Sequence, residues 1–363
     1  MNVDVSDLRM SHMVLPKKGE SASSFEKFDS WALGLPPYVG LSLSSYNVPK
    51  IIAVGGGKGG VGKSFVSANI AAKLGRSGHK VLLIDMDTGG ANIHTYLGMG
   101  RPLRSLIDFV VYENFEFSQV ISKTQFPSVD LIAGGKDELW SFEGGTAVAG
   151  TMNSLWSSLV HCKERYGYDC VILDLGAGNH IHTVDFFTAA HLGIVTILPE
   201  PTSIENAYAF LKSIFSRLLD HIGMHIEAYG VADLAKNIIG IGKNASGEEV
   251  KGSYQQKLRS MFEQHPEFIE KVFAALAGRT MGFVVNQIRS QRDIDVGYSM
   301  QAISKDYFGF NTKFLGYLNY DEVAWKSLRN RRLMIEDFPH AVLAKRLTEI
   351  SLVIEQLLFE SNS

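Results

Sequence analysis

The sequence of 363 residues is poor in cysteine, in net charge and in long apolar runs. Its two cysteines, Cys162 and Cys170, form no CxxC pair, which excludes a disulfide framework and a zinc or iron–sulfur site held by cysteines. The formal net charge of −3 argues against a protein that coats nucleic acid by bulk charge. No apolar run approaches the ~20 residues of a membrane span, and residues 1–10, with Asp4 and Asp7, do not resemble a signal peptide. These absences predict a protein of the reducing cytoplasm.

The composition that remains, 45% hydrophobic and 20% charged, is typical of a globular protein with a sizeable core. Residues 1–49 are rich in serine and lack periodicity, which predicts a flexible N-terminal extension, either a mobile tail or a partner-binding arm. From residue 50 onward, short β-branched apolar runs alternate with longer segments of helical period. This alternation predicts an α/β fold over residues 50–363, with a doubly wound, mostly parallel sheet flanked by helices. The expected strands are residues 51–55, 80–86, 129–133, 170–175, 193–198, 281–286 and 314–318.

Two later segments depart from this alternation. Between residues 224 and 279, a polar, glycine-bearing stretch at 243–252 precedes a helical stretch at 254–276, which predicts a helical insertion on the sheet. Residues 341–359 place apolar side chains at spacings of three and four, as in a helix with one apolar face. Acidic residues outnumber basic ones on its other faces, so we expect this last helix to pack on the core rather than to bind a membrane.

A glycine-rich segment follows the first expected strand directly and leads into a helical segment. Its sequence GKGGVGKS, residues 57–64, satisfies the pattern G-x-x-x-x-G-K-[ST]. In this context the glycines let backbone N–H groups turn toward phosphate oxygens, Lys63 reaches the β and γ phosphates, and the Ser64 hydroxyl ligates magnesium. The sequence therefore predicts a site for a nucleoside triphosphate and Mg²⁺. The residues expected to line it are Gly57, Lys58, Gly59, Gly60, Val61, Gly62, Lys63, Ser64 and Phe65.

A second lysine, Lys58, lies directly after the first glycine of this loop. With it, residues 58–64 match the signature K-G-G-x-G-K-[ST], and the sequence resembles the MinD/ParA group of deviant Walker ATPases, which share a P-loop NTPase fold. The resemblance implies ATP as the nucleotide and a slow ATPase activity. It also implies an ATP-dependent homodimer in which Lys58 reaches across the interface to the partner's phosphates. The segment at 199–207 either caps a helix locally or contributes to that dimer face.

Two acidic residues, Asp85 and Asp87, lie at the end of the second expected strand. Carboxylates at the C-terminal end of a parallel strand lie over the ligand crevice, where one of them can orient an attacking water. The resemblance to the family's D-x-D segment, called switch I, implies that Asp87 positions the water and that Asp85 lies on the magnesium side. Asn92, further along, is a candidate for holding switch I in place.

A third acid, Asp174, follows an apolar strand and precedes Gly176 and Gly178. This position places its carboxylate next to the glycine-rich loop, where it can hold magnesium through water, while the glycines let the loop move when the γ phosphate leaves. The chain has DLGAG where the family has D-x-x-x-G or D-[ST]-P-[AP]-G, so the details of this second switch differ. The residues expected to hold magnesium are Ser64, Asp85 and Asp174, and those expected to act in catalysis are Lys58, Lys63 and Asp87.

Two asparagines late in the chain are expected near the base of the nucleotide. The resemblance implies that Asn286, at the end of the sixth expected strand, reads the adenine edge. It also implies that the loop containing Asn319 closes over the ring, although many relatives carry proline at the position of Asn319. The match at the base is therefore weaker than the match at the phosphates.

The resemblance implies a molecular switch that controls the position of a cellular structure, which can be a division site, a flagellum, a chromosome or a protein array. It also implies an activating protein partner, whose identity the sequence leaves open. The flagellar FlhG/FleN branch often carries D-Q-A-x-x-L-R, of which only Asp7-Leu8-Arg9 is present here. Peripheral contact with a membrane surface or with nucleic acid also stays open. The densest basic cluster consists of Lys326, Arg329, Arg331 and Arg332.

Other P-loop proteins offer alternative functions. A metallocluster carrier or reductase of the Mrp or nitrogenase-iron-protein type needs cysteines after the third acidic strand end, whereas Cys162 and Cys170 precede Asp174. A bacterial tyrosine kinase would carry a tyrosine cluster in its last segment, where this chain reads ESNS. A nucleotide-binding module with negligible turnover is disfavoured by Lys58 and Asp87.

Overall fold

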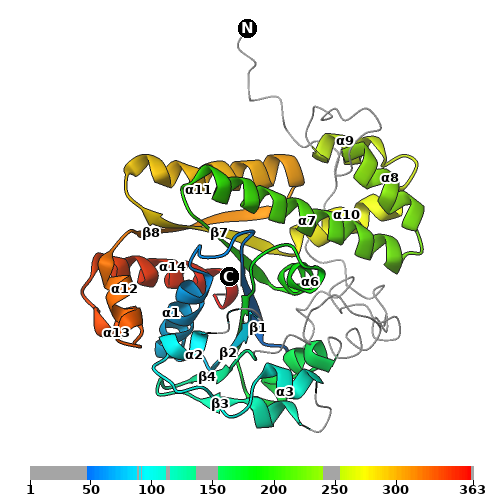
Figure 1. Cartoon of the computed structure of the whole chain (residues 1–363). Helices are drawn as coiled ribbons and strands as arrows, with labels where there is room; N and C mark the ends of the chain where they lie inside the picture. Colours follow the sequence, from blue (N-terminus) through cyan, green and yellow to red (C-terminus); the bar gives the residue numbers. More distant parts are fainter. Residues whose placement is uncertain are drawn as a thin grey trace.

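The computed structural model of the chain describes residues 47–87, 90, 92–111, 115–135, 154–239 and 254–360. Most of the predicted N-terminal extension at 1–49 and the polar stretch predicted at 243–252 lie outside these residues. The described part forms one sheet with helices on both faces (Figure 1). No helix within it is long and apolar enough to cross a membrane.

The sheet has eight strands, which are β1 (Lys50–Gly55), β2 (Val81–Met86), β3 (Ser122–Lys123), β4 (Val129–Ile132), β5 (Cys170–Leu175), β6 (Leu192–Ile197), β7 (Thr280–Ile288) and β8 (Asn311–Asn319). Their order is β3-β4-β2-β5-β1-β6-β7-β8. β3 runs antiparallel to β4, and all other neighbouring strands are parallel. This confirms the predicted fold class. β3 was not predicted, because its two residues carry no apolar pattern.

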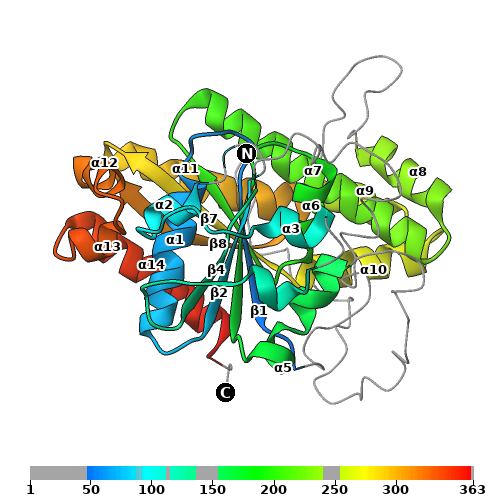
Figure 2. The ribbon, with the colours of Figure 1, turned by 60° about the horizontal axis from the view of Figure 1, so that its bottom comes forward.

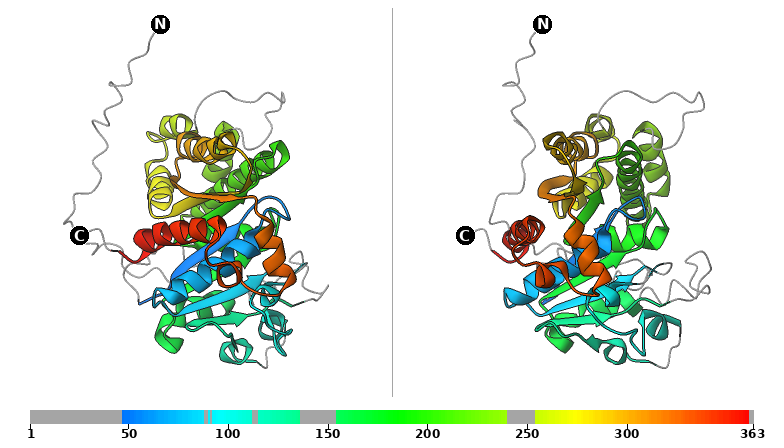
Figure 3. Two further views of the ribbon diagram at one scale, coloured as in Figure 1. Left: turned by 90° about the vertical axis from the view of Figure 1, so that its left-hand side faces the viewer. Right: turned by 60° about the vertical axis from the view of Figure 1, so that its left-hand side comes forward.

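The helices lie in two layers, one on each face of the sheet (Figures 1 and 3). One layer contains α1 (Lys63–Arg76), α2 (Ile93–Tyr96), α12 (Glu322–Arg329), α13 (Met334–Asp337) and α14 (Val342–Leu358). The other contains α3 (Leu106–Val111), α5 (Cys162–Tyr166), α6 (Ile181–Ala189), α7 (Pro201–His225), α10 (Pro266–Ala277) and α11 (Gln291–Ile303). The remaining helical segments are η4 (Phe117–Val120), α8 (Tyr229–Ile239), α9 (Tyr254–Ser260) and η6 (Ser304–Phe308).

The central strand β1 contributes to the apolar cores on both faces. Ile51 and Ala53 pack into the core on the α7 side, whereas Ile52 and Val54 pack into the core on the α1 side. Alternate side chains of a strand point to opposite faces, so a strand covered on both sides is a continuous apolar run. This is why such strands could be predicted from short apolar segments.

The predicted insertion at 224–279 is helical in its described part, but its internal boundaries differ from the prediction. α7 extends to His225, and α8, α9 and α10 follow as separate helices (Figure 2). The helical stretch predicted at 254–276 consists of two helices, because α9 ends at Ser260 and α10 begins at Pro266. Proline lacks the N–H that an interior helical position needs and fits the first turn of a helix, so Pro266 starts a new one.

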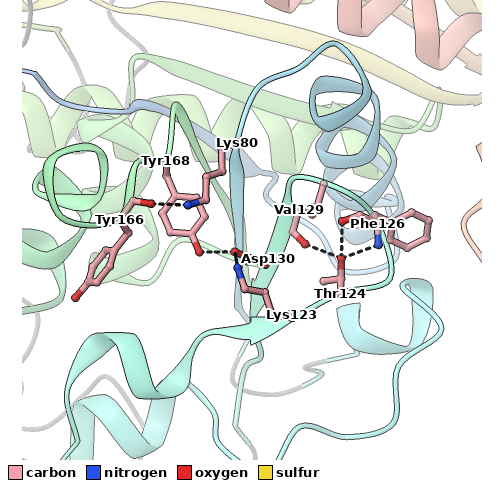
Figure 4. Close-up of polar contacts among 8 residues, drawn as sticks. All are labelled: Lys80, Lys123, Thr124, Phe126, Val129, Asp130, Tyr166 and Tyr168. Atoms are coloured by element: carbon pink, nitrogen blue, oxygen red, sulfur yellow. Dashed lines mark hydrogen bonds and ion pairs between the residues drawn. The ribbon is translucent and has the colours of Figure 1, made fainter.

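A polar cluster lies at the end of the sheet where β2, β4 and β5 begin, next to the antiparallel strand β3 (Figure 4). Asp130, only 5% exposed, accepts hydrogen bonds from the Tyr168 hydroxyl and the Lys123 ammonium group, each at 2.7 Å. Lys80 donates to the carbonyl of Tyr166 at 2.6 Å. Burial and the neighbouring Asp130 raise the pKa of Tyr168, which keeps its hydroxyl protonated as a donor. Asp130 is therefore a structural carboxylate with hydrogen-bonded partners. It lies at the end of the sheet opposite the glycine-rich loop.

The last helix, α14, packs on the core as its apolar stripe predicts. Leu343, Leu347, Ile350 and Ile354 are buried against the α1 side of the sheet. Near its end, Glu355 lies 3.0 Å from the His79 ring nitrogen in the turn after α1. Both an apolar face and a polar contact thus hold this helix to the fold.

We expect Leu347→Ala to lower the free energy of unfolding by about 2–5 kcal/mol, because Leu347 is fully buried and its removal leaves a cavity between α14 and the sheet. Leu352→Ala is the matched control, since Leu352 lies on the same helix and is 52% exposed. Urea unfolding followed by circular dichroism measures both. Equal losses in the two variants would show that α14 is not packed as described.

Candidate functional site

The glycine-rich loop joins β1 to α1 at the C-terminal edge of the sheet, between the ends of the two neighbours of β1. Gly60 and Gly62 have φ angles of 77° and 95°, which side-chain-bearing residues rarely adopt. A Cβ atom on Gly57 would lie 2.0 Å from the backbone oxygen of Asn206 in α7. These positions require glycine, and the loop backbone is thereby kept close to its neighbours.

The first turn of α1 is suited to an anion. Its N-cap residue, Gly62, provides no side-chain hydrogen bond, and the turn contains no acidic residue. No capping side chain therefore accepts a hydrogen bond from the N–H groups at the start of α1, and the helix dipole adds positive potential there. Lys63 is 7% exposed, and burial lowers the pKa of its ammonium group, while Asp174 and Asp87 act in the opposite direction. A buried cation thus lies beside this helix end.

Asp174 occupies the end of β5, directly next to β1 and β2. It is 1% exposed and accepts a hydrogen bond from the Ser67 hydroxyl at 2.8 Å and another from Ser64. Burial raises the pKa of Asp174, and the two hydroxyls and Lys63 oppose that rise by stabilising the carboxylate. Ser67 was not among the predicted residues. The sequence signal that could have identified Ser67 is its position four residues after Lys63, on the same face of the helix.

Asp85 lies opposite Asp174 in the register of the two neighbouring strands β2 and β5. Its carboxylate accepts the backbone N–H groups of Asp87 and Ile93, both at 3.1 Å. Burial, and then the like charge of Asp174, raise the pKa of Asp85. The structure therefore adds a function to the one predicted: Asp85 holds the start of α2 to the end of β2. Its expected contact with magnesium stays a prediction.

Asp87 lies where two loops meet. Its carboxylate accepts the backbone N–H of Gly90 at 3.0 Å, and a Cβ on Gly176 would lie 3.7 Å from the Cα atom of Asp87. The segment after β2 and the segment after Asp174 are thus in contact. Asn92 is the N-cap residue of α2. Its backbone oxygen accepts a hydrogen bond from the Thr95 N–H, and its side chain makes no cap hydrogen bond.

The second lysine of the loop, Lys58, contacts the loop between β6 and α7. Its ammonium group lies 3.1 Å from the Thr202 hydroxyl and 3.4 Å from the Glu200 carboxylate. Its side chain is 37% exposed. Lys58 is therefore held by residues of its own chain. These residues belong to the segment 199–207, for which a contribution to the dimer face stays a prediction.

The two predicted base-site asparagines lie at the ends of adjacent strands. Asn286, in β7, is buried and donates a hydrogen bond from Nδ2 to the carbonyl of Val61 in the glycine-rich loop, at 2.9 Å. Asn319 ends β8, opposite Ile288 of β7. The contact of Asn286 with the loop itself was not predicted. Their expected contacts with adenine stay predictions.

Comparison with known proteins agrees with this geometry. A family model described as an AAA domain matches residues 49–224. The chain is 31% identical over 173 residues to the antiactivator FleN of Pseudomonas aeruginosa, covering 47% of this chain and 58% of FleN. It is 31% identical over 171 residues to the flagellum site-determining protein YlxH of Helicobacter pylori, covering 45% of this chain and 53% of YlxH. The chain thus spans little more than half of these two curated relatives.

Among solved structures, the septum site-determining protein MinD of Pyrococcus horikoshii, complexed with Mg-ADP, has the same fold. It matches with a TM-score of 0.52 and 18% identity, covering 85% of this chain and 97% of MinD. The chain is similar in sequence and in fold to MinD/ParA-type P-loop proteins. The resemblance stated from residues 58–64 is confirmed. The parallel sheet, with the glycine-rich loop at residues 57–64, or P-loop, at the end of β1, agrees with that fold.

The two cysteines lie inside the fold. Cys162 and Cys170 are both fully buried, and burial raises the pKa of both thiols. Buried, protonated thiols are poor metal ligands. The structure therefore offers no observation in favour of the metallocluster alternative.

Proposed function

We propose that this protein is an ATP-dependent dimerising switch that binds ATP with Mg²⁺, hydrolyses it slowly, and controls the position of a cellular structure. The observation that supports it best is the convergence of Lys63, Asp174 and the Asp85 to Asp87 segment on one P-loop. A buried lysine and three carboxylates at the edge of a sheet suit a polyphosphate with its divalent cation.

The residues present fit both ligands. The uncapped start of α1 and the buried Lys63 would bind phosphate oxygens, and Ser64 and Asp174, already joined by a hydrogen bond, would hold Mg²⁺. Mg²⁺, when bound, would neutralise charge that develops on the phosphates. Asp87 would accept a hydrogen bond from water and orient it for attack.

The contacts among the loops support a switch. Asp85 connects the end of β2 to α2, and Asp87 lies against Gly176 in the segment after Asp174. A change at the γ-phosphate position would therefore be transmitted to both loops at once, because each loop carries one of the acids that surround it.

Dimerisation in trans requires Lys58 to leave Glu200 and Thr202. The ion pair is exposed, so its contribution is at most about 1 kcal/mol, and binding to a partner's phosphates can replace it. We expect wild-type protein to be a dimer with a non-hydrolysable ATP analogue and Mg²⁺, and Lys58→Ala to stay a monomer. Sedimentation velocity measures both.

The control for that experiment is Lys345→Ala, which removes an exposed lysine on α14, away from the P-loop. We expect it to dimerise like the wild type. A stable dimer of Lys58→Ala, or of the nucleotide-free protein, would contradict the role of Lys58 across the interface.

The structure that the protein positions is proposed from its relatives. YlxH is named a flagellum site-determining protein and MinD a septum site-determining protein, so a flagellum and a division site are both candidates. The direct test is phosphate release with Mg²⁺, with and without cell extract, combined with imaging of flagella and division sites in a deletion strain. Turnover that needs no Mg²⁺, or unchanged cells, would contradict the proposal.

A further inference from the structure

Asn286 connects a distant strand to the P-loop. It lies near the end of β7, is 6% exposed, and its Nδ2 atom donates to the Val61 carbonyl across 225 positions of sequence. Val61 is itself 1% exposed, so both partners of this hydrogen bond are shielded from water. A shielded hydrogen bond of this kind is costly to break without a replacement.

The backbone around Asn286 is arranged to aim its side chain at the loop. The pairing of β7 with β8 shifts between Val285 and Ile288, and Gln287 within this irregularity has a φ angle of 58°. A left-handed conformation is unfavourable for glutamine. The Gln287 N–H donates to Asn286 Oδ1 at 2.8 Å, which stabilises that conformation and fixes the amide plane.

The same amide also fits the glycine that precedes Lys63. A Cβ atom on Gly62 would lie 2.2 Å from Asn286 Nδ2, and Gly62 has a φ angle of 95°. Gly62 therefore leaves room for Asn286 as well as providing the turn. Asn286 contacts the loop at two consecutive residues, immediately before the phosphate-binding lysine.

We propose that Asn286 is a positioning residue for the P-loop, which it holds through the Val61 carbonyl. This inference rests on the proposed function, since it concerns the same nucleotide site. One N–H of the amide holds the loop, and the other N–H is left to contact a base. Asn286 thereby links the base end of the site to the phosphate end, so it sets phosphate affinity as well as base selectivity.

The test uses Mg²⁺-tripolyphosphate, a ligand with phosphates and no base, beside ATP and GTP, with affinities measured by isothermal titration calorimetry. We expect Asn286→Ala to weaken tripolyphosphate about five- to tenfold. ATP should be weakened by at least the same factor, because it also loses the contact of the amide with the base. Asn286→Asp should weaken both further, because its carboxylate faces the Val61 carbonyl oxygen. An unchanged tripolyphosphate affinity together with a weaker ATP affinity would overturn the proposal, because it is the result for a residue that reads only the base.

Asn311→Ala is the matched comparison, since Asn311 is an exposed asparagine at the start of the neighbouring strand β8, at the opposite end of the sheet from the P-loop, and donates to the Thr280 hydroxyl at 3.1 Å. It should leave tripolyphosphate affinity unchanged. If it weakens tripolyphosphate as much as Asn286→Ala does, the effect is not specific to the Asn286 contact, and the proposal is overturned. If wild-type protein binds neither ATP nor tripolyphosphate, the proposed function itself fails, which is a distinct result.

A variant at a buried position can lose its fold, so a second measurement uses the wild type. Hydrogen exchange of the amides at 57–64 is followed with and without saturating adenosine, which has a base and no phosphates. A link through Asn286 predicts slower exchange in the loop when adenosine is bound. Exchange that does not change would overturn the link between the base and the P-loop.

Discussion

Asp87→Ala is expected to bind ATP almost as tightly as the wild type. Its rate of ATP hydrolysis is expected to be at least about a hundredfold lower. A carboxylate that orients the attacking water contributes along the reaction path and little to ground-state binding. Its position beside Gly176, in contact with the loop after Asp174, suits that function. Phosphate release at saturating ATP and equilibrium binding of a fluorescent ATP analogue measure the two effects separately.

Asp87→Asn and Asp295→Ala are the controls for this variant. Asp87→Asn keeps an oxygen that can accept the Gly90 N–H and removes the charge, so it separates loop positioning from water activation. Asp295 is an exposed acid on α11, and its removal should change neither rate nor affinity. Parental turnover in Asp87→Ala would show that another residue orients the water.

The acidic part of the site could be predicted because strand direction determines it. Asp85 and Asp174 each end an apolar run, and parallel strands bring their carboxyl ends to one edge of the sheet. The pattern of residues 57–64 predicted the loop, since glycines at this spacing followed by lysine and serine have few other uses. These inferences needed only the order of residues and the geometry of a strand.

The contacts of individual side chains could not be predicted in this way. Lys58 contacts Glu200 and Thr202, and Asn286 contacts Val61, in pairs separated by more than a hundred positions. A sequence shows that a long or amphipathic side chain is present but does not indicate which of several acceptors it reaches. The same limit applies to Asp85, because its two amide donors belong to a turn whose path depends on the packing of α2.

Lys63→Ala is expected to lower ATP affinity about 10- to 100-fold, which corresponds to the ~1–3 kcal/mol of a charged hydrogen bond to phosphate. Lys58→Ala, in the same loop, is the matched control: at concentrations where the protein is a monomer, its ATP affinity should stay near that of the wild type. Isothermal titration calorimetry measures both, and an unchanged affinity in Lys63→Ala would contradict the assigned phosphate contact.

The pH dependence of binding gives this variant a second signature. The positive charge of Lys63 lowers the pKa of Asp174, which burial raises, so its removal allows that pKa to rise further. A higher pKa means that Asp174 takes up a proton at a higher pH, and a protonated carboxyl group is a poor Mg²⁺ ligand. As pH falls from 8 to 6, Mg²⁺-dependent nucleotide binding should therefore weaken earlier in Lys63→Ala than in the wild type. Identical pH profiles would show that Lys63 does not stabilise the ionised Asp174.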